Sequence, residues 1–143
     1  MTGQETQPIE TAIGIIDGRD SIYLDAIAYD YSQHTITFSG EINTRLCSAS
    51  PYTTRWLPYS LTFQAIIGLR QTEEDFYAGP YDSSFFVVTV SPWFDEMRQQ
   101  DHSGKLGSRH QHFVLATYDD VFDVIAESFA LNLGIQRQLE ALS

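Results

Sequence analysis

The sequence has little positive charge. It holds 8 Lys and Arg residues against 19 Asp and Glu residues, a formal net charge of −11, and Lys105 is its single lysine. Nucleic-acid binding draws most of its affinity from cationic side chains that neutralise phosphates, and anionic membrane surfaces attract the same side chains. The composition therefore predicts that neither nucleic acid nor a membrane is a partner.

Cysteine is almost absent as well. The single residue, Cys47, excludes an intramolecular disulfide and a thiolate-rich zinc site. It lies in the loop-like stretch LCSASP with no histidine nearby in sequence, which favours a small, partly buried residue over a nucleophile. The N-terminal stretch MTGQETQPIET has neither the basic start nor the apolar core of a secretory signal. No apolar run approaches the ~20 residues that cross a bilayer. We therefore expect a cytoplasmic protein.

What is present is typical of a small folded protein. The chain has 143 residues, of which 43% are hydrophobic and 13% aromatic, far too many aromatics for a disordered acidic chain. Length and composition predict a single domain over residues 11–143, preceded by a frayed segment over residues 1–10.

Alternation of apolar and polar residues predicts strands over most of the length. The clearest is the stretch 59–70, YSLTFQAIIGLR, which alternates except at Ile66. Residues 21–31 and 35–40 are typical of a hairpin, and the uncharged stretch 84–90, SFFVVTV, of a central strand covered on both faces. A turn at Gly79-Pro80 is expected to join the strand at 84–90 to the strand at 59–70 as a hairpin.

Two short helices are expected. Ser91-Pro92 ends a strand and can start a helix that runs to about residue 100. Thr117 and Asp120 have the spacing of a helix N-terminus, followed by apolar residues at helical spacing over 121–126 and by a final strand over 129–135. A continuous helix to about residue 133 is the alternative. The sequence thus predicts an α+β fold, with a mainly antiparallel curved sheet or half-open barrel of six to eight strands and two short helices.

The histidines and carboxylates give weak signals for chemistry. His102, His110 and His112, with Asp101 or Asp119, could ligate zinc, but their spacing matches no established metal motif, so solvent-facing polar residues are the preferred interpretation. We expect no metal and no cofactor. Motifs for a serine nucleophile, a phosphate-binding loop or a dinucleotide site are absent, so the sequence favours a protein that is not an enzyme.

Aromatic residues provide the most informative functional pattern. They gather around a long loop and a turn, interleaved with an arginine, and Tyr, Trp and Arg are the residues that dominate binding hot spots. The candidate binding residues are Tyr52, Arg55, Trp56, Tyr59, Tyr77 and Tyr81. Exposed, they would form an interaction patch or the rim of a ligand cavity; buried, they would cap the core.

The closing segment HFVLATYDDVFDVIAESFALNLG resembles, in its compact strand–helix–strand outline, some toxin-immunity proteins. The net charge of −11, the single small domain and the absence of a catalytic motif favour a non-catalytic, immunity-like binding module for a protein partner, a basic one given the charge. The alternative is a small-ligand-binding protein or hydrolase with its site in the barrel mouth. A symmetric homodimer is also expected, because an open antiparallel sheet leaves edge strands that this chain cannot protect with lysines.

Overall fold

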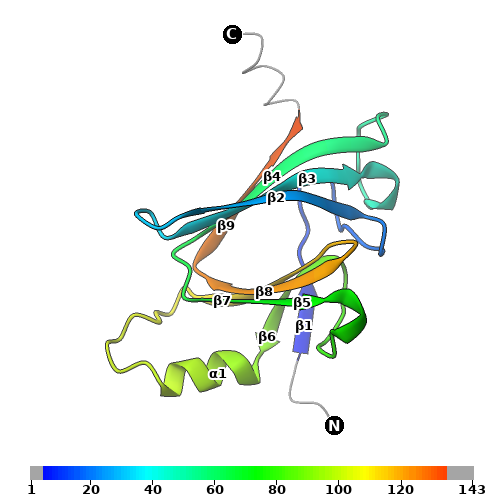
Figure 1. The fold of residues 1–143 in the computed structure, drawn as a ribbon. Helices are drawn as coiled ribbons and strands as arrows, with labels where there is room; N and C mark the ends of the chain where they lie inside the picture. Colours follow the sequence, from blue (N-terminus) through cyan, green and yellow to red (C-terminus); the bar gives the residue numbers. More distant parts are fainter. Residues whose placement is uncertain (1–4, 135–143) are drawn as a thin grey trace.

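The computed structural model describes residues 5–134 and shows two antiparallel sheets packed face to face (Figure 1). Strand orders are β1-β6-β7-β8-β5 in the five-stranded sheet and β2-β3-β4-β9 in the four-stranded sheet. The elements are β1 (Glu5–Pro8), β2 (Ile22–Asp30), β3 (Thr35–Asn43), η1 (Thr44–Leu46), β4 (Trp56–Gln64), β5 (Gly68–Glu73), η2 (Glu74–Phe76), β6 (Phe85–Val90), α1 (Pro92–Gln99), β7 (Gln111–Ala116), β8 (Asp120–Ala126) and β9 (Ser128–Leu133).

The main core lies between the two sheets. Alternate residues of β3 and β4 point into it, and Phe63 lies near its centre, with its ring packed against those of Phe38, Phe85 and Phe113. Edge-to-face contacts of this kind add to the large apolar area that each ring buries. The expected antiparallel, strand-rich fold is confirmed, but over residues 5–134 the sheets do not close into a barrel, and nine strands and one α-helix replace the expected six to eight strands and two helices.

The long strand expected over residues 59–70 is two strands in different sheets. β4 ends at Gln64 and β5 begins at Gly68, and between them Ala65 adopts a left-handed conformation with φ 55°. The chain crosses from one sheet to the other at this point, which explains why Ile66 broke the alternation. The predicted hairpin between residues 59–70 and 84–90 is wrong, because β4 lies in the other sheet from β6, and β5 is separated from β6 by β7 and β8.

The predicted helix after Thr117 is instead strand β8. The Thr117 hydroxyl donates to the carbonyl of Asp120 and accepts from its N–H, so the same residues close a tight turn between β7 and β8. Both faces of β8 are buried, so its apolar residues do not alternate with polar ones. Apolar residues therefore also fall at the spacing expected of a helix. β9 confirms the expected final strand over its described part, and the continuous-helix alternative is wrong.

Residues 84–90 form an interior strand as predicted, since β6 lies between β1 and β7. β1 falls within the segment expected to be frayed, yet it is antiparallel to β6, with Pro8 opposite Phe86. Residues 1–4 of that expected segment lie outside the described residues. The predicted hairpin over residues 21–40 is confirmed as β2 and β3.

The predicted helix at residue 92 is confirmed as α1, which lies on the outer face of the five-stranded sheet (Figure 1). Ser91 caps it, and Pro92 occupies the first turn, where its missing N–H costs nothing. A Cβ on Gly68 of β5 would lie 3.1 Å from both Trp93 and Met97, so the glycine lets the helix pack closely on the strand. Within residues 5–134, no helix has the length and apolarity needed to cross a membrane.

Candidate functional site

Five aromatic and arginine residues form a continuous stack at the end of the molecule where β2 and β4 begin. We call it the aromatic ladder: Arg55, Trp56, Tyr23, Tyr118 and Arg19. The Arg55 guanidinium lies 5.3 Å from the centre of the Trp56 ring, and Trp56 meets Tyr23 edge-on at 5.1 Å. Tyr23 stacks on Tyr118 at 5.0 Å with an angle of 13° between the rings, and Arg19 lies 4.9 Å over Tyr118. The ladder therefore joins the four-stranded sheet to the turn between β7 and β8.

Both arginines are exposed, whereas the three rings are half-buried. Burial, then Asp20 and Tyr118, raise the pKa of Tyr23, while Arg55 lowers it. Arg19 also forms an ion pair with Glu74, with 3.2 Å between Nη2 and Oε2, although this contact lacks the geometry of a hydrogen bond. The charge of Arg19 is thus offset within the protein, and the rings lie among carboxylates.

A cleft of about 530 Å³ adjoins the ladder and shares Arg19 with it. Its walls include Tyr77 and Tyr81 from the loop before β6. The Tyr81 hydroxyl lies 3.2 Å from Asp17 Oδ1, and the Tyr77 hydroxyl donates to the carbonyl of Pro80. Burial raises the pKa of Tyr77, which keeps the phenol neutral. The cleft is lined by Asp17, Gly18, Arg19, Glu74, Tyr77, Gly79, Tyr81, Ala116, Thr117 and Val121.

The structure distributes the six residues predicted from sequence among the ladder, the cleft and the core. Arg55 and Trp56 belong to the ladder, and Tyr77 and Tyr81 line the cleft. Tyr59 is a core residue, 2% exposed, whose hydroxyl donates to the carbonyl of Tyr23 beneath the ladder. Tyr52 is half-buried against the main core.

Sequence reasoning missed Arg19, Tyr23 and Tyr118. Each is distant in sequence from Trp56, and only the pairing of β2 with β3 and of β3 with β4 brings Tyr23 beside it. One feature of the sequence could have identified Tyr23: it is a large aromatic residue on the other face of its strand from the apolar residues Ile22 and Leu24.

The two histidines near β7 are buried, so the expectation that they face solvent is wrong. His110 precedes β7, accepts from the N–H of Gly107 at Nδ1 and lies 3.1 Å from the Ala65 carbonyl at Nε2. His112 points under α1 instead. Among residues 5–134, no three potential metal ligands gather in one place.

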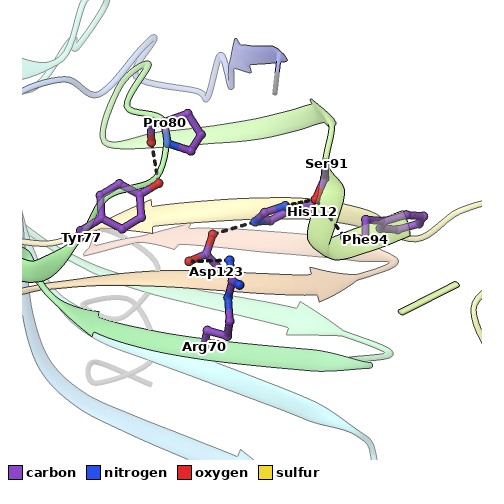
Figure 2. A network of polar contacts seen from close by, with 7 residues as sticks. All are labelled: Arg70, Tyr77, Pro80, Ser91, Phe94, His112 and Asp123. Atoms are coloured by element: carbon purple, nitrogen blue, oxygen red, sulfur yellow. Dashed lines mark hydrogen bonds and ion pairs between the residues drawn. The ribbon is translucent and has the colours of Figure 1, made fainter. Parts of the chain in front are cut away.

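A buried polar network joins α1 to the sheet below it (Figure 2). His112 Nε2 lies 2.7 Å from Asp123 Oδ1, and His112 Nδ1 lies 2.7 Å from the hydroxyl oxygen of Ser91. The same oxygen accepts the N–H of Phe94 at 3.0 Å, so Ser91 both caps α1 and contacts the histidine.

Arg70 completes the network from the solvent side (Figure 2). Its Nη2 lies 3.7 Å from Asp123 Oδ2, and its guanidinium lies 4.1 Å over the ring of Trp93. The hydrogen bonds run from serine to histidine to carboxylate, the order found in hydrolytic triads, although there the carboxylate usually bonds Nδ1. Ser91 and His112 also line a cavity of about 550 Å³ together with Phe94, Asp95 and Arg98.

A further cavity, of about 730 Å³, lies at the opposite end of the sheets from the ladder. Its lining is apolar at Ile66, Ile67 and Met97 and carries charges of both signs at Lys105 and Glu127. Asp101 adds a second carboxylate, so the cavity has the same balance of two acids and one base as the cleft.

Comparison with protein-family models, curated proteins and solved structures gives no match to this chain.

Proposed function

We propose that this protein is a binding module that recognises a basic, extended segment of a protein partner at the aromatic ladder and the adjoining cleft. The observation that carries the proposal is the ladder itself, in which three rings and two arginines from three separate parts of the chain stack at one end of the molecule. Aromatic and arginine residues of this kind supply most of the binding energy in protein interfaces.

The charges around the ladder favour a basic segment. Asp17 of the cleft is exposed, as are Asp20 and Asp119, which lie near enough to Tyr23 to raise its pKa, against Arg55 and the already paired Arg19. Lysine and arginine side chains can lay their aliphatic stems on tyrosine and tryptophan rings while their charged ends reach carboxylates. The net charge of −11 would also speed the encounter with a cationic partner.

Trp56 offers a direct probe of binding. The chain has two tryptophans, and Trp93 belongs to α1 and packs against Arg70 and His112 rather than the ladder, so a Trp93→Phe variant leaves Trp56 as the only reporter. Titration with an extended Lys- and Arg-rich peptide of about 12 residues should change its fluorescence. A Glu-rich peptide of equal length is the control and should leave it unchanged.

Tyr118→Ala removes the ring between Tyr23 and Arg19 of the ladder and should weaken binding of the basic peptide at least about tenfold, the size of a hot-spot loss. Tyr31→Ala, which removes an exposed tyrosine at the far end of β2, is the matched control and should bind as the unsubstituted protein does. Equal binding of the acidic and basic peptides, or no effect of Tyr118→Ala, would refute the proposal.

The Ser91 network supports a second candidate function, a hydrolase, because the serine hydroxyl oxygen lies 2.7 Å from Nδ1 of a histidine that is held by a carboxylate. Ser91 is only 5% exposed and its oxygen already accepts a backbone N–H, so this function ranks second. The test is reaction with a fluorophosphonate: the Ser91 oxygen would bond to phosphorus, fluoride would leave, and His112 would take the hydroxyl proton. Labelling of Ser91 no faster than of the exposed Ser103 would exclude it.

A further inference from the structure

Strand β2 is an edge strand, and the stretch of it between the bulge at Asp25 and the charge of Asp30 carries no protection of its own. It pairs only with β3 within the described part of the chain, and residues 25–30 are all exposed. A register shift between Leu24 and Ala26 bulges the strand at Asp25. Beyond that bulge, residues 26–29 read Ala-Ile-Ala-Tyr, with no lysine, proline or charge to deter another strand.

The exposed apolar side chains of β2 lie on the face that forms the core elsewhere in the sheet. Ile27 lies opposite Phe38 and Tyr29 opposite Ile36, and both partners on β3 are fully buried. Ile27 and Tyr29 are nevertheless 37% and 48% exposed. Tyr31 extends this face, with its ring stacked on that of Tyr29 at 5.4 Å. The apolar face of the four-stranded sheet is therefore left open along this edge.

We propose that a second copy of this chain covers the edge, with β2 of each copy pairing antiparallel to form one continuous eight-stranded sheet. The proposal does not rest on the binding function assigned to the ladder. In an antiparallel pair, residues directly opposite each other point to the same face of the sheet. The core faces of both copies therefore lie on the same side only when one residue of β2 lies opposite the same residue of the other copy, with the two-fold axis between them.

The side chains select one register. With Ala28 on the axis, Ile27 of each copy lies opposite Tyr29 of the other, which gives two aliphatic–aromatic cross-strand pairs. If Ile27 lay at the axis, Asp25 of each copy would lie opposite Tyr29 of the other. If Tyr29 lay at the axis, Ile27 of each copy would lie opposite Tyr31 of the other, which belongs to the turn. The two small Ala28 side chains leave room for the strands to approach at the axis.

Oligomeric state tests the pairing. Sedimentation of the full chain at about 100 μM should show a dimer, and the association constant should be no smaller at about 0.5 M salt than at about 0.05 M, because apolar contacts dominate and like charges are screened. Ile27→Lys places a charge on the pairing strand and should weaken the dimer at least tenfold. Gln71→Lys adds the same charge to the exposed edge strand β5 and should leave it unchanged.

Disulfide cross-linking tests the register in a Cys47→Ala background. Ala28→Cys should form an intermolecular disulfide on oxidation. Ala26→Cys, on the same face of the strand, should not, because two residues from the axis the α-carbons are separated by more than the ~7 Å that a disulfide can span. A monomer at both salt concentrations, a dimer indifferent to Ile27→Lys, or equal cross-linking of the two cysteine variants would overturn the proposal.

Discussion

Asp123 and His112 form a buried hydrogen-bonded pair, with 2.7 Å between Oδ1 and Nε2 and side-chain exposures of 4% and 3%. The two residues lie on adjacent strands, β8 and β7, and point to the face covered by α1. Their contact ties the sheet to the capping serine of the helix. This buried polar contact helps to hold α1 against the sheet, and no motif in the sequence predicted it.

Removal of the carboxylate should destabilise the protein strongly. Asp123→Ala leaves a buried imidazole N–H without an acceptor, so we expect a loss of about 2–4 kcal/mol in the free energy of unfolding, measured by urea denaturation. Arg70→Ala removes only the half-exposed partner and should cost less than about 1 kcal/mol. Equal losses for the two variants would contradict this description of the network.

Gly40 should tolerate no side chain. It lies on β3 opposite the bulge of β2, and a Cβ there would come within 1.9 Å of the carbonyl oxygen of Tyr23. Gly40→Ala should therefore cost about 2–3 kcal/mol through forced movement of the backbone. Gly107→Ala meets nothing closer than 3.8 Å and should change stability by less than about 1 kcal/mol. A neutral Gly40→Ala variant would show that the bulge can relax.

The buried phenol of Tyr59 predicts instability in alkali. Burial, and then Asp25, raise its pKa above the ordinary value of 10.0. The folded state therefore holds the proton more tightly than the unfolded state, so this stabilisation is complete below pH 10 and is lost as the pH rises above it. The free energy of unfolding should fall above pH 10, and less steeply in Tyr59→Phe. Identical slopes for the two proteins would contradict the assignment.

Cys47 should be a slow thiol. Its half-burial raises its pKa to about 11, so little thiolate exists near neutral pH. Alkylation at about pH 8 should be more than about tenfold slower than that of free cysteine, and its rate should keep rising up to about pH 11. A rate that levels off near the pKa of free cysteine, about 8.5, would contradict the prediction.

The sequence predicted local elements well where a single face is buried. The β2–β3 hairpin and the capped helix α1 follow from alternation and from Ser91-Pro92. β8 was mistaken for a helix because both of its faces are buried and its periodicity was lost. The sequence did not predict that the chain crosses from one sheet to the other at Ala65. The residues before and after Ala65 alternate in the same way, although they belong to different sheets.

Site prediction failed where the relevant contacts are distant in sequence. Trp56 and Arg55 are neighbours and were found together, whereas Tyr23 and Tyr118 reach them only through strand pairing. His112 was predicted to face solvent because its partners, Ser91 and Asp123, carry no motif that links them. In both cases the missing information was the register of strands, which a single sequence does not contain.

The most direct test of the account is to map binding on the folded protein by backbone amide chemical shifts. Addition of a Lys- and Arg-rich peptide should shift amides in residues 17–23, 54–56, 74–81 and 117–119, around the ladder and the cleft. Amides of α1 and of the β2–β3 turn should stay unchanged and serve as the internal control. Shifts centred on α1 and Ser91, or no shifts at all, would contradict the assignment of the ladder as the binding site.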